Sequence, residues 1–186
     1  MKQFYIFTIV LLTLSSSSYT LAQQTVVATG LRNDIEGILF HGNNLYLSGG
    51  VTHKISKLDV TAETPNLTDV FFDIETLKIP SAFALRGNDL YIWNSGYSRI
   101  SKINIDGTTP SLTDVVEVLG TIGRLAFKGT DLYISDFVNN KIYKTDIGDT
   151  NPTLTEVITE IVRPYGMAIS GTDLYVTSTQ NGKIYK

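Results

Sequence analysis

The hydrophobic and polar positions of this chain recur in blocks. In each block, apolar runs of strand length alternate with short stretches rich in Gly, Asn, Asp, Thr and Pro. The most regular part of each block is the motif Gly-x-[Asn/Asp]-Leu-Tyr, which begins at Gly42, Gly87, Gly129 and Gly171, at spacings of 45, 42 and 42 residues. The runs are rich in β-branched and aromatic residues and lack a helical period, so they indicate short strands and tight turns. A repeat of this length predicts a β-propeller with one blade per repeat.

Each repeat contains four apolar runs, which we interpret as the strands of one blade. The first run carries small residues such as Gly37, Ala82 and Gly166, as expected where inner strands approach each other closely near the propeller axis. The expected strands span residues 36–40, 45–47, 54–60 and 68–74, then 82–85, 90–93, 99–105 and 113–119, then 124–127, 132–135, 141–147 and 155–161, and finally 165–169, 174–177 and 183–186.

The two ends of the repeat array predict how the ring closes. Residues 24–31 resemble the fourth strand of a repeat, and the last repeat stops within its third strand. We therefore predict an all-β propeller of four blades of about 42 residues, with the N-terminal strand closing the last blade and covering its open edge. The alternative is a partial propeller of six to eight blades, either truncated or completed by a second chain. The predicted oligomeric state is accordingly a monomer or a ring-completing dimer.

The first 22 residues have the features of a signal peptide. Lys2 precedes an apolar run at 4–14, and small residues lead up to Ala22. The run is too short to cross a bilayer, and no other stretch approaches that length, so no membrane span is expected. We predict cleavage after Ala22, a propeller domain at 23–186, and a secreted or periplasmic location.

Composition excludes several classes of function. The chain has no cysteine, which excludes disulfides and thiolate catalysis. Its 15 Lys and Arg face 18 Asp and Glu, without a basic cluster, which argues against nucleic acid as a partner. No Ser-His-Asp order or Gly-x-Ser-x-Gly elbow occurs, so no catalytic residues are assigned. The two histidines, His41 and His53, fall in loops on opposite faces of the expected disc.

The clearest repeat copy, residues 132–144, resembles the NHL and YVTN-type propeller repeats of secreted bacterial proteins. The repeats are also similar to blades of the gluconolactonase and senescence-marker lactonase family, and the resemblance covers residues 24–186. It implies a propeller fold, and for the lactonases a divalent cation held on the axis by an early Glu with Asn and Asp side chains. Glu36 matches that Glu, but the equivalent positions of the later blades are Ser81, Gly123 and Tyr165 instead of the expected Asn.

Comparison of the four repeats predicts where a ligand would bind. The hairpin loops are nearly uniform, whereas the loops before the first strands and after the second strands differ from blade to blade, and both sets lie on one rim. We call this surface the variable rim: residues 32–36, 78–81, 121–124 and 163–165, with 48–53, 94–97, 136–140 and 178–181. Its variation fits either a binding surface on a rigid scaffold or relaxed constraint on solvated loops.

The favoured interpretation is a binding or scaffold module for a protein or carbohydrate ligand, without a metal or other cofactor, rather than an enzyme. The candidate binding residues are Glu36, Trp93, Asn94, Tyr97, Arg124, Asp136, Arg163 and Tyr165. For Trp93 the competing interpretation is packing between blades, and for the charged residues it is a set of surface ion pairs. The alternative function is a metal-dependent, lactonase-like hydrolase centred on Glu36, which would need a divalent cation such as calcium.

Overall fold

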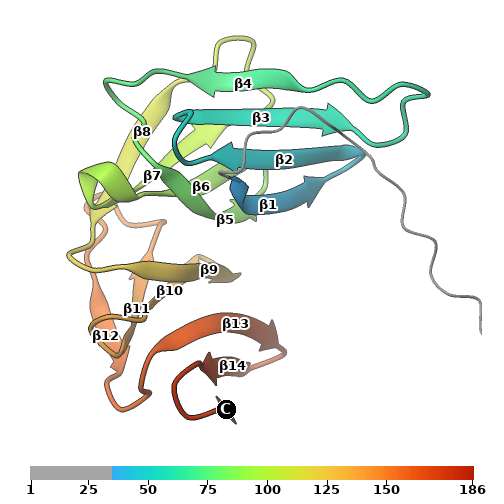
Figure 1. Ribbon diagram of the computed structural model, residues 1–186. Helices are drawn as coiled ribbons and strands as arrows, with labels where there is room; N and C mark the ends of the chain where they lie inside the picture. The colour runs from blue at the N-terminus through green and yellow to red at the C-terminus, as the bar shows by residue number, and fades with distance from the viewer. Residues whose placement is uncertain (1–34) are drawn as a thin grey trace, which may run out of the picture.

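The fold is a β-propeller of four blades. The computed structural model describes residues 35–186, so the predicted signal peptide and the predicted N-terminal closing strand lie outside the described residues. The blades are antiparallel sheets whose strands follow chain order (Figure 1). Three described blades have four strands and the last has three. The predicted all-β fold with one blade per repeat is confirmed, and the one helical element within residues 35–186 is the short η1 (Ser95–Tyr97).

We number the blades in chain order, and their strands are as follows. Blade 1 has β1 (Ile35–His41), β2 (Asn44–Gly49), β3 (Lys54–Asp59) and β4 (Thr68–Phe72). Blade 2 has β5 (Pro80–Arg86), β6 (Asp89–Asn94), β7 (Arg99–Asn104) and β8 (Leu112–Glu117). Blade 3 has β9 (Ile122–Lys128), β10 (Asp131–Asp136), β11 (Lys141–Asp146) and β12 (Thr155–Ile158). Blade 4 has β13 (Pro164–Ser170), β14 (Asp173–Ser178) and β15 (Lys183–Tyr185).

The glycine that begins the repeated Gly-x-[Asn/Asp]-Leu-Tyr motif lies in the first hairpin loop of every blade. In blade 1, His41 pairs with Asn44, which leaves a loop of two residues between β1 and β2. Gly42 adopts a φ of 58°, and its equivalents Gly87, Gly129 and Gly171 have φ between 58° and 62°. Such tight hairpin loops require a left-handed backbone that glycine adopts at no steric cost. The repeated motif therefore marks the first hairpin turn of each blade.

The inner strands pack against one another in chain order, β1 on β5, β5 on β9, and β9 on β13. Their small residues allow this approach. A Cβ added at Gly37 would lie 2.2 Å from the carbonyl oxygen of Ser81 in the next blade. The convergence expected from the small residues of the first runs is therefore present.

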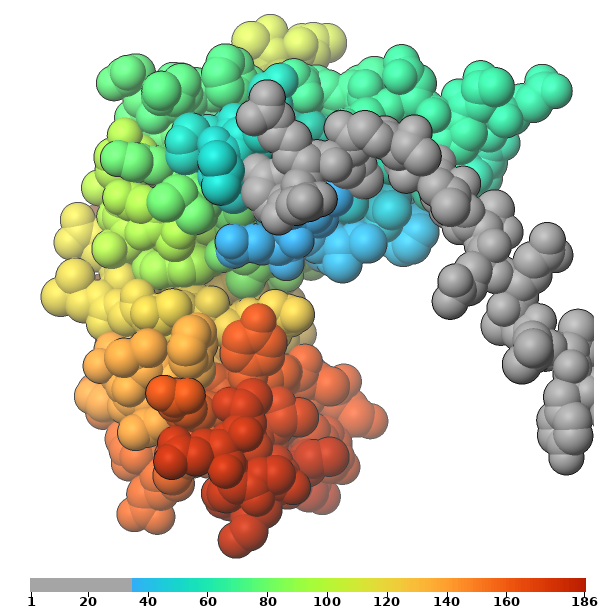
Figure 2. All heavy atoms as spheres, in the orientation of Figure 1, coloured from blue at the N-terminus to red at the C-terminus, as the bar shows by residue number. Residues whose placement is uncertain are grey.

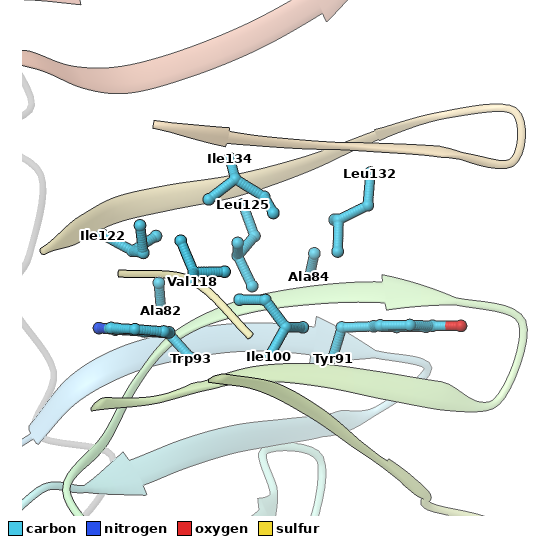
Figure 3. Close-up of a cluster of buried hydrophobic side chains, with 10 residues drawn as sticks. All are labelled: Ala82, Ala84, Tyr91, Trp93, Ile100, Val118, Ile122, Leu125, Leu132 and Ile134. Atoms are coloured by element: carbon cyan, nitrogen blue, oxygen red, sulfur yellow. The ribbon is translucent and has the colours of Figure 1, made fainter. Parts of the chain in front are cut away.

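The hydrophobic core lies between the blades. Between blades 2 and 3, Figure 3 shows Tyr91, Trp93 and Ile100 from blade 2 facing Leu132 and Ile134 from blade 3. Similar clusters fill the interfaces of blades 1 and 2 and of blades 3 and 4. Side chains along each strand alternate between the preceding and the following blade, because successive residues of a strand point to opposite faces. Both faces of an interior blade are therefore apolar.

Within residues 35–186, the array of blades is open between blade 1 and blade 4. Figure 2 shows open space between blade 1, in blue, and blade 4, in red. Within residues 35–186, no helix is long and apolar enough to span a membrane. The predicted location outside the cytoplasm rests on residues 1–22 and stays a prediction.

Candidate functional site

A cavity opens on the variable rim where the inner strands begin. Its volume is about 570 Å³, within the range of small-molecule sites. All four blades contribute to its wall. The lining residues are Ile35, Glu36, Ile79, Ser81, Ala82, Trp93, Ser95, Thr121, Ile122, Gly123, Arg124, Phe137 and Tyr165. We call this hollow the axial cavity, and four of the eight predicted binding residues lie in it: Glu36, Trp93, Arg124 and Tyr165.

The most distinctive group in the wall combines Arg124 of β9 with Tyr165 of β13. The Arg124 guanidinium carbon lies 4.9 Å from the centroid of the Tyr165 ring, and Nη1 is 3.4 Å from the Tyr165 hydroxyl. Nη1 also donates to the carbonyl of Gly123 at 2.8 Å, which fixes the side chain over the ring. The edge-to-face partner of Tyr165 is Phe137, with ring centroids 5.8 Å apart. Arg124 and Tyr165 thus form a cation–π pair in which a hydrogen bond to the backbone holds the guanidinium in place.

Arg124 and Glu36 are the two charged side chains in the wall of the axial cavity. None of the ion pairs formed within residues 35–186 includes either residue. Both side chains are exposed, and they come from different blades of the same cavity wall. Among residues 35–186, the competing interpretation of a salt-bridged rim therefore does not describe these two residues. An accessible guanidinium can instead bind a carboxylate or phosphate of a ligand.

Trp93 has a mainly structural environment. It is 2% exposed and packs in the cluster between blades 2 and 3 (Figure 3), and it also lines the axial cavity. This is the packing role weighed for it from the sequence. Because so little of the indole is accessible, it cannot present its face to a sugar ring without movement of its neighbours.

Asn94 and Asp136 occupy equivalent positions at the ends of β6 and β10, and both are buried. The Asn94 amide accepts from Lys78 N and donates to Thr76 O, each at 2.8 Å. The Asp136 carboxylate accepts from Thr121 N at 3.3 Å and from backbone N–H groups of the loop that follows β10. Both side chains therefore hold the connection from the preceding blade against the second strand.

Tyr97 and Arg163 belong to the variable rim but do not line the axial cavity. The Tyr97 hydroxyl donates to the carbonyl of Glu75 at 2.8 Å, and its ring lies 5.6 Å from the guanidinium carbon of Arg99. Arg163 is exposed, has a φ of 48°, and donates its backbone N–H to Asn140 Oδ1 at 2.8 Å. The structure thus does not bring Trp93, Asn94 and Tyr97 together as one ligand-facing cluster.

Sequence reasoning missed Phe137 as well as the hydroxyl-bearing residues Ser81, Ser95 and Thr121 in the cavity wall. All four lie within the variable rim, so the axial cavity opens on the surface that the loop comparison singled out. Within residues 35–186, no three His, Asp or Glu side chains gather as a set that could hold a metal ion. Asn94 and Asp136, which a Glu36-centred metal site would have needed, hold backbone groups instead.

Comparison with known proteins supports the fold and leaves the activity open. Neither a protein family model nor a curated protein sequence matches the chain. The solved structures that resemble it include the computationally designed Ika4 protein, with a TM-score of 0.62 and 14% identity over 88% of this chain and 96% of that one. Streptogramin B lyase has a TM-score of 0.62 and 16% identity over 81% of this chain and 50% of that one.

A third similar structure is luciferin-regenerating enzyme, with a TM-score of 0.56 and 18% identity over 81% of this chain and 55% of that one. The chain thus spans about half the length of the two enzymes. Identities this low indicate a shared β-propeller fold, and the same fold supports unrelated functions.

Proposed function

We propose that this chain is a secreted, NHL-like propeller that binds a carbohydrate in the axial cavity, and that the sugar carries a carboxylate. The observation behind the proposal is the Arg124–Tyr165 pair, a held cation on an aromatic ring at the mouth of a cavity of about 570 Å³. A cavity of this size suits one or two sugar rings better than a folded protein surface. A glycan is therefore favoured over a protein ligand.

The chemistry of the wall supports an acidic sugar. Tyr165 is 37% exposed and offers apolar surface to the C–H face of a ring. Within residues 35–186, the Arg124 guanidinium forms hydrogen bonds only through Nη1, which leaves other donors for a carboxylate. A charge-assisted hydrogen bond of this kind is stronger than a neutral one. Ser81, Ser95 and Thr121 add hydroxyl groups to the same wall. Glu36 lies in the wall as well, and its charge would disfavour a ligand carboxylate placed beside it.

The alternative hydrolase centred on Glu36 has weaker support. Its two candidate co-ligands, Asn94 and Asp136, are buried and hydrogen bonded to the backbone. The two enzymes among the similar structures share the fold at identities of 16% and 18%, and activity does not follow from such a likeness.

Binding can be measured through the only tryptophan, because Trp93 lines the cavity and its fluorescence reports on the site. Uronic-acid oligosaccharides and their neutral counterparts are titrated against the protein. We expect the acidic series to bind more tightly, and Arg124→Gln to weaken it at least tenfold, or about 1.4 kcal/mol. Arg163→Gln is the matched control, since this arginine lies on the same rim outside the cavity. Equal affinity of acidic and neutral sugars, or no loss in Arg124→Gln, would contradict the proposal.

The secreted location has its own test. Expression of the full chain with export machinery should yield a protein in the periplasm or medium whose N-terminal residue is Gln23, as expected from cleavage after Ala22. A chain that stays in the cytoplasm with Met1 intact would contradict secretion without bearing on the sugar site.

A further inference from the structure

The outer face of blade 4 has the residues of a blade-to-blade interface, but no other blade within residues 35–186 covers it. On the third strand of each blade, one isoleucine points toward the following blade. Ile55, Ile100 and Ile142 are fully buried there, whereas the equivalent Ile184 is 73% exposed. Ala168 of β13 is likewise exposed, although its equivalent Ala84 is buried in the interface of blades 2 and 3. Blade 4 therefore carries the apolar half of a further blade-to-blade contact.

The outer face of blade 1 carries the other half of such a contact. Ile38 and Phe40 of β1 point away from blade 2 and are 65% and 60% exposed. The residues equivalent to Ile38 in blades 2 and 3 are Phe83 and Leu125, and both are buried against the preceding blade. Leu85 and Phe127, the equivalents of Phe40, likewise pack against the preceding blade, so both exposed residues of β1 occupy positions that interior blades use for a blade-to-blade contact.

A polar feature repeats the same pattern. Ser48 Oγ accepts from Gly37 N at 2.6 Å within blade 1 and donates to Ser81 O of blade 2 at 3.2 Å. Ser135 Oγ likewise accepts from Arg124 N at 2.9 Å and donates to Tyr165 O of blade 4 at 2.8 Å. These hydroxyl groups join neighbouring inner strands.

Blade 4 has the same hydroxyl at the same place. Thr177 Oγ1 accepts from Gly166 N at 2.8 Å, but the residue is exposed, and its hydrogen bonds within residues 35–186 stay within its own blade. By equivalence with Ser81 and Tyr165, the carbonyl that it would meet in a following blade is that of Glu36. Blades 4 and 1 are thus matched both in apolar side chains and in hydrogen-bonding groups.

We propose that two copies of this chain associate head to tail, with blade 4 of each copy packing on blade 1 of the other, to form one ring of eight blades. Within one chain the two faces lie apart across open space (Figure 2), while three interfaces with fully buried side chains hold the arc. Closing the arc on itself would displace those packed interfaces, and packed interiors resist such displacement. A second copy covers both faces without that change.

The lengths of two of the similar structures agree with this assembly, whereas Ika4 has about the length of one copy. The chain spans 50% of streptogramin B lyase and 55% of luciferin-regenerating enzyme, so two copies supply about the number of residues that those single chains use. The contact is heterologous, because each copy uses two different faces, and it closes after two copies. The inference goes beyond the proposed sugar site and does not depend on it.

The first test is the mass of the purified protein by light scattering over a range of concentrations. We expect twice the chain mass for the wild type, and the single-chain mass for Ile184→Asp and for Phe40→Asp. The matched control is Leu119→Asp, which alters an exposed leucine outside both terminal faces and should leave the double mass. Circular dichroism checks that each variant is folded. A wild type with the single-chain mass, or a double mass that survives both substitutions, would overturn the proposal.

The second test tells a two-copy ring from a ring closed within one chain. Because the chain has no cysteine, Ile38→Cys and Ile184→Cys each introduce a unique thiol. A short bismaleimide added to a mixture of the two variants should give a covalent dimer, and added to the double variant it should link separate chains. Linkage within single chains, or no linkage in the mixture, would overturn the proposal. Loss of sugar binding in Arg124→Gln affects neither readout, so failure of one proposal is distinguishable from failure of the other.

Discussion

The interface between blades 2 and 3 and the outer faces of blades 1 and 4 are made from the same repeated positions, yet their surroundings differ. Ile100 is fully buried beside Leu125, while the equivalent Ile184 is 73% exposed. The difference shows that each repeat specifies both halves of a blade contact, whether or not a neighbour is present in the chain. Residue type therefore predicts the capacity for burial, and the neighbour decides burial itself.

The largest expected effect is the loss of a buried isoleucine at the interior interface. Ile100→Ala leaves a cavity between blades 2 and 3, and such truncations cost about 2–5 kcal/mol of unfolding free energy. Ile184→Ala is the matched substitution on the open face, and we expect a change within about 0.5 kcal/mol when the protein is dilute enough to be a single chain. Urea unfolding measures both. Similar losses in the two variants would show that the faces do not differ.

Two equivalent glycines give the next effect. A Cβ at Gly37 would meet the carbonyl oxygen of Ser81 in blade 2 at 2.2 Å, and this backbone atom is held by the sheet. A Cβ at Gly166 would meet the Thr177 hydroxyl of its own blade at 3.0 Å. We expect Gly37→Ala to cost about 1–3 kcal/mol, as other overpacking substitutions do. Gly166→Ala should cost clearly less by the same thermal or urea measurement, and the reverse order would contradict the comparison.

A stabilising substitution sharpens the comparison from the other side. Thr145 of β11 is buried, and its hydroxyl is the one buried side-chain polar atom within residues 35–186 that lacks a hydrogen-bond partner. The equivalent residues, Leu58 and Ile103, are apolar and buried. Replacing an unsatisfied hydroxyl by a methyl group removes a desolvation cost, so Thr145→Val should raise the unfolding free energy by about 1 kcal/mol.

The control for that substitution lies on the open face of blade 4. Thr177 Oγ1 accepts a hydrogen bond from Gly166 N, so Thr177→Val should be neutral or destabilising. A stabilisation of equal size in both variants would attribute the gain to valine's preference for strands rather than to the unsatisfied hydroxyl.

The sequence predicted the blades well because the signal was local. The glycine turns at Gly42 and its equivalents, and the alternating apolar runs, act within one hairpin, and the structure has a hairpin at each. Closure of the ring is a different kind of question, since it concerns residues at opposite ends of the chain. The segment that was expected to close the last blade lies outside residues 35–186, so that prediction remains open.

The candidate site was predicted in part. Glu36, Arg124 and Tyr165 line one cavity because inner strands begin on the same rim, and this follows from repeat alignment. The direction in which individual side chains point did not follow from the repeat alignment. Trp93 stands where blades 1 and 3 have Ser48 and Ser135, so it points at the next blade rather than at solvent. Phe137 lines the cavity because of the path of the loop after β10, and the periodicity of the repeats does not predict the path of a loop.

The smallest expected effect concerns an ion pair that is repeated in blades 1, 2 and 3. Lys54 of β3 bonds Asp69 of β4, and Arg99–Asp114 and Lys141–Glu156 are its equivalents in blades 2 and 3. The hydrogen bond from Lys54 lowers the pKa of Asp69 below its ordinary value of 3.8. The pair therefore stabilises the folded chain above that value, and the contribution is lost as the pH falls through the lowered pKa of the folded state.

Removing the carboxylate in Asp69→Asn should reduce stability at pH 7 by about 0.2–1 kcal/mol and flatten the fall in stability below pH 4. Glu63→Gln, which removes an exposed carboxylate outside these pairs, should leave the pH dependence close to that of the wild type. Thermal unfolding between pH 2 and 7 compares the three proteins, and an equally steep acid limb in Asp69→Asn would show that the repeated pair adds nothing to the stability of the blade.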